Sequence, residues 1–110
     1  MEDCIFCKIA NGEIDSAKVF EDEKLIALND INPKAKVHIL IIPKKHIESI
    51  KHLEESEAEL IGEMFLAAQK IANDKNLGGY KLLFNVGREG GQLVDHLHLH
   101  LLSPEQEKLI

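Results

Sequence analysis

The sequence is poor in the residues that mark several common classes of protein. Its 110 residues include no tryptophan, one tyrosine, three prolines and two cysteines. So few cysteines argue against a disulfide-rich secreted scaffold, and without a proline-rich or glycine-rich stretch no linker is expected. Apolar runs such as Ile39 to Ile42 are far shorter than the roughly 20 residues that a membrane-spanning helix needs.

Positive charge is also scarce, because 13 lysines and arginines stand against 19 acidic residues, a formal net charge of −6. An acidic surface repels a phosphodiester backbone, whereas one local pocket can still bind a small nucleotide. The acidic start Met1-Glu2-Asp3 lacks the positive region of a secretory signal. The sequence therefore predicts a cytoplasmic protein that binds neither nucleic acid nor a membrane.

Hydrophobic spacing predicts an α+β fold in one domain that spans residues 1–110. A short helix is expected over residues 3–11 and a long one over residues 56–76. Five stretches are typical of strands, namely residues 18–21, 24–29, 37–42, 80–86 and 97–102. We expect them to form a mainly antiparallel sheet on which the helices pack.

The long helix has expected start and stop signals. Ser56 and Glu59 have the spacing of a capping box, and Gly78-Gly79 is a plausible end. Its apolar residues form two adjacent stripes, which suggests burial against the sheet and against a second surface. That surface is either a partner subunit or a groove of the helix's own sheet.

The run from Asp95 to Leu101 alternates histidine and leucine. On a strand His96, His98 and His100 would share one face, with neighbouring Cα atoms roughly 6.5–7 Å apart. Three hypotheses compete: surface or core histidines without chemistry, a catalytic zinc site, and an imidazole nucleophile that attacks phosphorus. The spacing alone does not separate the last two.

Cys4 and Cys7 form a second constellation. Residues three apart on a helix face the same way, and two such thiols are half of a structural zinc site. The alternatives are a redox pair, although no strand precedes the motif, and buried thiols without a metal.

Motifs along nearly the whole chain resemble the histidine triad family. The central one is His96-x-His98-x-His100 followed by Leu101-Leu102. In the family's order, it is preceded by Ile5-Phe6-x-Lys8-Ile9, Gly12-Glu13-Ile14, Asp30-Ile31-Asn32-Pro33, His38, Ile41 to His46, Asn85-x-Gly87 and Gly90-Gly91-Gln92. Within the family the chain looks like the adenosine phosphoramidase branch, in its zinc-bearing prokaryotic type.

The resemblance implies a nucleotide hydrolase that cleaves P–N, P–S or P–O linkages of nucleoside monophosphate conjugates. His98 would be the nucleophile, His100 would assist the leaving group, and His38 and His96 complete the predicted catalytic set. Phosphate contacts would come from Asn85, Gln92 and the amides near Leu93 and Val94. Asp30 would bind the ribose, and the base pocket would comprise Ile5, Phe6, Ile9, Leu28 and Ile31.

The resemblance also implies a metal and partners. His46 and His96 are the candidates to complete a structural zinc site with Cys4 and Cys7. Such a site would remove His96 from direct catalysis. The catalytic reaction itself is expected to need no cofactor. The expected partners are a purine nucleotide substrate, a conjugate of AMP or GMP, and a second copy of the chain. One departure is Leu93, where phosphoramidases commonly carry a serine that touches the phosphate.

Overall fold

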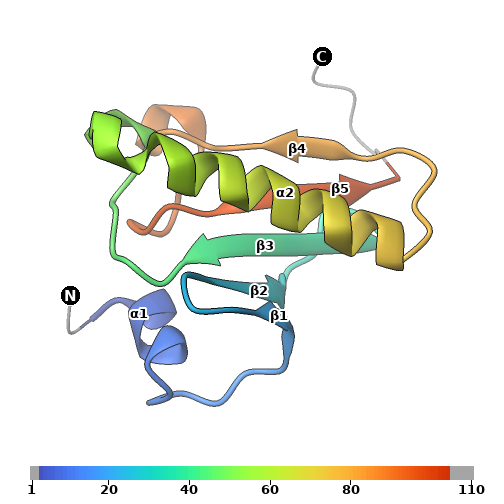
Figure 1. Ribbon diagram of the computed structural model, residues 1–110, viewed down its shortest axis with the longest axis horizontal. Helices are drawn as coiled ribbons and strands as arrows, with labels where there is room; N and C mark the ends of the chain where they lie inside the picture. The colour runs from blue at the N-terminus through green and yellow to red at the C-terminus, as the bar shows by residue number, and fades with distance from the viewer. Residues whose placement is uncertain (1–2, 105–110) are drawn as a thin grey trace.

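The computed structural model describes residues 3–104 (Figure 1). Met1 and Glu2, which belong to the acidic start considered above, and residues 105–110 lie outside the described residues. Five strands form one antiparallel sheet in the order β1-β2-β3-β5-β4. They are β1 (Lys18–Glu21), β2 (Leu25–Asn29), β3 (Val37–Pro43), β4 (Lys81–Leu83) and β5 (Leu99–Ser103). Among the described residues, no helix combines the length and apolar character needed to cross a membrane.

The two helices pack on opposite faces of this sheet. The long helix α2 (Ala58–Asp74) lies across the face seen in front in Figure 1. Alternate residues of β2 and β3 point toward it, and their neighbours point the other way toward the short helix α1 (Ile5–Ala10). Because both faces are covered, β2 and β3 are apolar almost throughout. The predicted α+β fold is confirmed.

The start of α2 differs from the prediction. A 3-10 helix (Glu55–Glu57) precedes it, and the backbone amide of Glu54 donates to the Glu57 carboxylate at 2.8 Å. The chain thus enters through a tighter turn, and the reciprocal cap forms before Ser56 rather than at it. The predicted capping box at Ser56 and Glu59 is therefore wrong.

The end of α2 also differs. The helix ends at Asp74, and Asn76 takes the left-handed conformation with φ of 57°. The Leu77 amide then donates to the Ala72 carbonyl at 3.0 Å, so the last turn is closed before Gly78-Gly79. Asparagine is among the few other residues that adopt this conformation readily, and here it replaces the expected glycine stop.

The two C-terminal strands are shifted or shorter than predicted. β4 pairs with β5 only from Lys81 to Leu83, because the following residues leave the sheet toward the loop. β5 begins at Leu99, so His96 and His98 precede the strand instead of lying in it. The alternation survives on the apolar side, where Leu97, Leu99 and Leu101 are at most 1% exposed in the α2-facing core.

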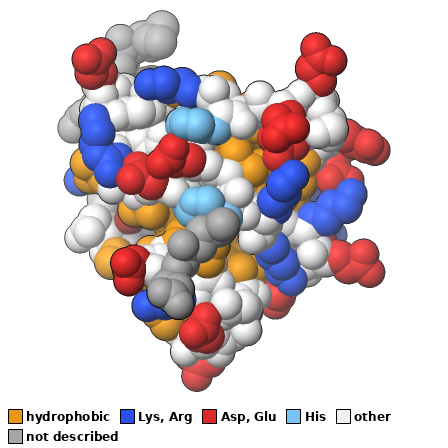
Figure 2. Space-filling view, turned by 90° about the vertical axis from the view of Figure 1, so that its left-hand side faces the viewer, with side chains coloured by type: hydrophobic (Ala, Val, Ile, Leu, Met, Phe, Trp, Pro, Cys, Tyr) orange, Lys and Arg blue, Asp and Glu red, His pale blue; other side chains and the backbone are white. Residues whose placement is uncertain are grey.

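Charges of both signs are interspersed over the face shown in Figure 2, where histidine side chains also reach the surface. Two adjacent lysines that follow β3 are paired with acids of their own chain. Lys44 Nζ lies 2.9 Å from Glu21 and Lys45 Nζ lies 2.8 Å from Glu57. Both ammonium groups are thus held by ion pairs outside the pocket described below.

Candidate functional site

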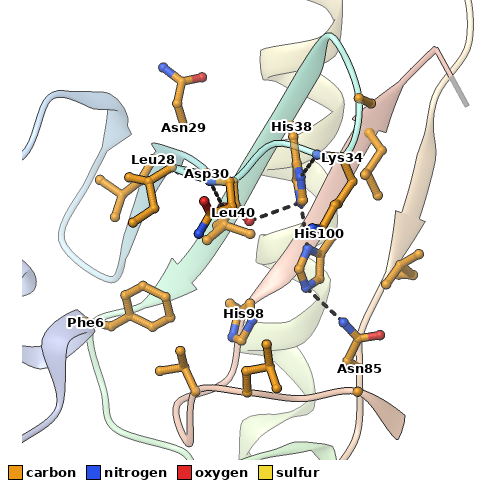
Figure 3. Close-up of a pocket in the computed structure, with 18 of the residues that line it drawn as sticks. Phe6, Leu28, Asn29, Asp30, Lys34, His38, Leu40, Asn85, His98 and His100 are labelled. Atoms are coloured by element: carbon orange, nitrogen blue, oxygen red, sulfur yellow. Dashed lines mark hydrogen bonds and ion pairs between the residues drawn. The ribbon is translucent and has the colours of Figure 1, made fainter. Parts of the chain in front are cut away.

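A pocket of about 660 Å³ lies on the face of the sheet opposite α2 (Figure 3). β3 and β5 form its floor, α1 closes one end, and the loop before β5 forms a side. It brings together most of the residues that the sequence suggested, including His38, His98, His100, Asp30 and Asn85. One elongated cavity therefore joins an imidazole cluster to an apolar end.

His38 and His100 come from adjacent strands. In the register of β3 and β5, His38 is opposite Leu102 and His100 is opposite Leu40, so the two histidines are diagonal neighbours on one face. Their nitrogens, His38 Nε2 and His100 Nδ1, lie 2.9 Å apart. Asp30, at the end of β2, places its carboxylate 3.4 Å from the same His38 nitrogen.

The side chain of His98 is fixed by the backbone two residues earlier. Its Nδ1 lies 2.7 Å from the carbonyl oxygen of His96, which can only accept a hydrogen bond. Nδ1 therefore carries a proton, and in the tautomer with that single proton Nε2 keeps its lone pair. The His98 and His100 rings lie side by side, with centroids 4.9 Å apart. His98 thus combines a defined tautomer with a place in the wall of the pocket.

Burial keeps His38 and His100 neutral. Desolvation, followed by the neighbouring His98 and His38 rings, lowers the pKa of His100 to about 4, while the Asp30 carboxylate opposes the shift. Burial lowers the pKa of His38 as well, again against the attraction of Asp30. A neutral imidazole is the form that can act as a nucleophile or orient a neighbour by hydrogen bonding.

These lowered pKa values predict a loss of stability in acid. Between pH 6.5, where an unfolded histidine takes up its proton, and about pH 4, where folded His100 does so, protonation favours the unfolded chain. Between pH 7.5 and pH 4.5 the free energy of unfolding of wild type should fall. We expect that of the His100→Asn variant to fall by about 1–3 kcal/mol less. Urea unfolding at both pH values measures the difference. Equal losses in the two proteins would contradict the burial of a neutral His100.

The other end of the pocket is apolar. It is lined by the predicted base-pocket residues of α1 and of β2 and the turn after it: Ile5, Phe6, Ile9, Leu28 and Ile31. Phe6 and Ile9 are buried, whereas Ile31 is 90% exposed at the rim. The edge of Phe6 meets the His98 ring, with centroids 5.3 Å apart. A flat apolar group in this end would therefore lie next to His98.

The loop before β5 gives the pocket Gly91, Leu93 and Val94, while Asn85 comes from the segment after β4. The Asn85 amide lies 3.3 Å from His100 Nε2. Gln92 does not line the pocket, because its side chain donates to the carbonyls of Glu48 and Val94 and accepts from the Gly87 amide. It holds the loop in shape. Leu93, by contrast, is 82% exposed.

The second constellation of the sequence is also brought together. Cys4 and Cys7 at the start of α1 meet His46, which follows β3, and His96. His96 Nδ1 lies 3.2 Å from the Cys4 sulfur and 3.5 Å from the Cys7 sulfur, and His46 Nδ1 lies 3.2 Å from the Cys7 sulfur. All four ligand atoms lie within 4.8 Å of one another.

This Cys-His cluster fits a tetrahedral metal ion. Bond lengths of about 2.3 Å to sulfur and about 2.0 Å to nitrogen imply edges of about 3.5 Å between ligand atoms. The His96 ring is prepared for this role, because Nε2 donates to the Pro43 carbonyl at 2.7 Å and leaves the Nδ1 lone pair toward the sulfurs. Burial raises the pKa of the Cys7 thiol to about 11, so a bound cation would displace its proton. The cluster can hold a metal such as zinc.

The structure also places residues in the pocket that the sequence did not suggest. Lys34 and Ala35 come from the turn before β3, and Lys81, Leu83 and Leu102 come from the end where β4 pairs with β5. Nothing in their spacing marks them, because only the pairing of strands and the path of the turn before β3 bring them to the pocket. The turn signal Asn32-Pro33 could have pointed to the neighbourhood of Lys34.

Comparison with known proteins places this arrangement in a family. Residues 3–110 match the family model described as "Scavenger mRNA decapping enzyme C-term binding". The chain is 45% identical over 104 residues to Protein HitA of Neisseria gonorrhoeae, which covers 94% of this chain and 97% of that protein. The chain belongs to the histidine triad family.

Solved structures support the assignment of this chain to the histidine triad family. A HIT family hydrolase from Legionella pneumophila is 48% identical, with a TM-score of 0.91 over 94% of this chain and 95% of that one. A histidine triad protein from Clostridium difficile is 44% identical, with a TM-score of 0.92 over 97% and 95%. In this chain, the three histidines that give the family its name divide between the two clusters, His96 at the cysteines and His98 and His100 in the pocket.

Proposed function

We propose that this histidine triad protein hydrolyses nucleoside 5′-monophosphate conjugates at the α-phosphate, through a nucleotide covalently bound to His98. The observation that carries the proposal is the hydrogen bond from His98 Nδ1 to the His96 carbonyl. It leaves the other ring nitrogen as a free nucleophile in a pocket whose apolar end suits a nucleoside. The linkage cleaved is of the phosphoramidate type, P–N, P–S or P–O, as in the adenosine phosphoramidase branch.

The reaction takes two displacements. The Nε2 lone pair of His98 forms a bond to phosphorus, and the bond to the leaving atom breaks with its electron pair going to that atom. The leaving atom takes up one proton. Water then attacks phosphorus and releases one proton, and the phosphorus–nitrogen bond returns its pair to His98. The two steps together consume one water and yield the free nucleoside monophosphate and the protonated leaving group.

The neighbours of His98 stabilise charge as it develops. His100 stands beside His98 and next to Asn85, where it can assist the leaving atom, while Asn85 and the amides near Leu93 and Val94 contact phosphate oxygens. Donors fixed in advance around a developing charge contribute most in a site from which water is excluded. His38 holds His100, and His96 acts on His98 only through its carbonyl oxygen.

The apolar end binds the base, and Asp30 binds the ribose hydroxyls. Phe6 offers a flat buried surface beside His98, with Ile9 and Leu28 completing the wall. The Asp30 carboxylate lies between this end and the imidazoles, as Figure 3 shows. The pocket suits a nucleotide with its phosphate over His98, and the resemblance to the adenosine phosphoramidase branch implies a purine nucleotide, a conjugate of AMP or GMP.

The Cys-His cluster holds structural zinc in this proposal. Cys4, Cys7, His46 and His96 would be its ligands, and the ion would supply folding free energy by fixing α1 to the sheet. A hydrolytic metal held by the three histidines together is disfavoured, because neither group of potential metal ligands among the described residues contains His98. Cys4 and Cys7 form no disulfide with each other, which suits the reducing cytoplasm where we place the protein.

Mass spectrometry of the intact protein tests the proposal. After brief mixing with adenosine 5′-phosphoramidate, the wild type is expected to gain the mass of one AMP group, which later decays as free AMP appears. Tight binding of AMP without any adduct, and without release of AMP over hours, would instead indicate a nucleotide-binding module that acts through another protein.

Leu93 offers a way to raise the rate. It is 82% exposed at the pocket, where a serine hydroxyl could donate to a phosphate oxygen. We expect Leu93→Ser to increase kcat for the phosphoramidate about threefold to tenfold, the contribution of one modest hydrogen bond, without changing the melting temperature. Steady-state kinetics measures this, with Leu93→Ala separating the added hydroxyl from the lost apolar bulk. Equal rates in both variants would rule out a phosphate contact at this position.

The protein is proposed to be a homodimer. Phe65 and Leu66 of α2 are 40% and 65% exposed, and Phe65 packs edge-on against Phe84, which follows the edge strand β4. These apolar side chains therefore lie next to the segment that follows the outer strand of the sheet. We expect Leu66→Glu to convert the dimer to a monomer without lowering helix content, as measured by light scattering and circular dichroism. A monomeric wild type would refute the dimer.

A further inference from the structure

We infer that the backbone amide of Lys34 sets the tautomer of His100 through His38, so that His100 presents an N–H donor at Nε2 to the reaction site. Two consecutive contacts carry this inference, and a third, with Asn85, has to adapt to it. It rests on the proposed function only for its catalytic consequence, because the tautomers themselves are properties of the free protein.

The first contact fixes the direction of the chain of hydrogen bonds. The Lys34 amide nitrogen lies 3.0 Å from His38 Nδ1. A backbone N–H can only donate, so His38 Nδ1 must accept and the single proton of the neutral ring must be on Nε2. Neither partner can reverse this contact while His38 is neutral, and burial lowers the pKa of His38.

The second contact fixes which nitrogen of His100 is protonated. His38 Nε2 lies 2.9 Å from His100 Nδ1 and 3.4 Å from the Asp30 carboxylate, so its proton is donated to the nearer nitrogen and attracted by the acid. His100 Nδ1 is then an acceptor. Because His100 is also neutral near pH 7, its own proton lies on Nε2.

The third contact is with Asn85. The structure places Asn85 Nδ2, a donor, 3.3 Å from His100 Nε2, and a half-turn of the amide would exchange its nitrogen and its oxygen. A protonated Nε2 requires the oxygen of Asn85 to face it. The inferred tautomer of His100 therefore comes with a half-turn of the Asn85 amide, after which the Nε2–H of His100 can donate to Asn85 or to a substrate atom. Figure 3 shows the three side chains in line.

The positions of the ring protons also distinguish the group of Asp30, His38 and His100 from the Cys-His cluster. Asp30, His38 and His100 also have potential ligand atoms within 4.8 Å of one another. A cation on His38 Nε2 would need that nitrogen's lone pair, which would force a proton onto Nδ1 against the Lys34 N–H. His96 has the opposite arrangement, in which a carbonyl takes the Nε2 proton and leaves Nδ1 free. The His38–His100 pair is therefore arranged to donate a hydrogen bond, and the Cys-His cluster is arranged to bind a metal.

In the proposed hydrolysis, His100 thus acts as a hydrogen-bond donor to the atom that gains negative charge as its bond to phosphorus breaks. His38 and Lys34 are positioning residues, since neither needs to touch the substrate for this effect. The Lys34 contribution comes from its backbone. A change of its side chain that keeps the amide should therefore leave the tautomers of His38 and His100 unaltered, even though the side chain lines the pocket.

Nitrogen NMR of the free protein labelled with 15N-histidine tests the inference. Long-range 1H–15N spectra distinguish a protonated from an unprotonated ring nitrogen, and the signals of each ring are assigned by their loss in His38→Asn and His100→Asn. The wild type is expected to show unprotonated Nδ1 and protonated Nε2 for both rings. A proton on Nδ1 of either ring would overturn the inference.

Two variants test the origin of the order. Lys34→Pro removes the amide proton, and Lys34→Ala keeps it. We expect the second tautomer to appear in Lys34→Pro alone, with kcat about twofold lower than in Lys34→Ala if half of the molecules hold the wrong tautomer, and with the same KM in both variants. Unaltered tautomers in a folded Lys34→Pro would overturn the role of the amide. If Lys34→Pro does not fold, a scalar coupling between Lys34 N and His38 Nδ1 in the wild type decides, because its absence would overturn the contact itself.

The readouts separate this inference from the proposed function. Tautomers are measured without substrate, so ordered rings in a protein that forms no AMP adduct would preserve the relay and refute the hydrolysis. An AMP adduct in a protein whose histidine tautomers are mixed would support the hydrolysis and refute the relay.

Discussion

Replacing His98 with alanine is expected to lower kcat for adenosine 5′-phosphoramidate by at least about a thousandfold, which corresponds to about 4 kcal/mol of transition-state stabilisation. The reason is chemical, because the variant lacks the nitrogen that would bond to phosphorus. AMP should still bind with nearly the wild-type Kd, since the apolar end and Asp30 are intact. Kinetics, calorimetric titration with AMP and the intact mass of the protein measure the three quantities.

His52→Ala is the matched control for this substitution. His52 is a half-exposed histidine that bonds to Ser49 and Glu48 and does not line the pocket. It should turn over substrate at the wild-type rate and form the adduct. Substantial turnover in His98→Ala, or an AMP adduct on it, would mean that another group attacks phosphorus.

Removing both sulfurs is expected to have the largest effect on stability. The double variant Cys4→Ser, Cys7→Ser should lose its bound metal and unfold more than about 10 °C below wild type, since several kcal/mol of binding free energy no longer favour the folded state. The same variant should bind AMP more weakly. Phe6 lies between the two cysteines and touches both His96 and His98, so a loosened α1 also loosens the base pocket.

Metal analysis, calorimetric melting and AMP titration measure these effects, with Lys8→Ser as a control on the same helix. His98→Ala should retain the full metal content, because His98 is not among the four ligands of the Cys-His cluster. Loss of metal from His98→Ala, with retention in the double cysteine variant, would place the ion at the three histidines and reverse our assignment.

Several features of this protein could be predicted from the sequence because they depend on local periodicity. The alternating leucines at 97, 99 and 101 belong to the core as expected, and the spacing of Cys4 and Cys7 places both thiols together. Strong apolar patterns likewise predicted all five strands to within a few residues. The ends of elements were less predictable, because the cap of α2 depends on how the chain enters the helix.

The division of labour among the histidines was decided by the tertiary structure. Alternation predicts that His96, His98 and His100 share one face, but it does not say that His96 meets two sulfurs from the N-terminal helix. Nor does it say that His98 uses a backbone carbonyl to fix its tautomer. Long-range packing supplies both partners, and they give similar side chains different chemistry.

The sequence by itself determined the residue types, the strand and helix pattern and the resemblance to a family. Only the folded chain decided that Gln92 supports the loop instead of lining the pocket, and that the Lys34 amide orders His38. The physical reason is the same in both cases. A backbone N–H or C=O is present at nearly every residue and leaves no mark in the sequence, so its partner is chosen only when strands pair and loops close.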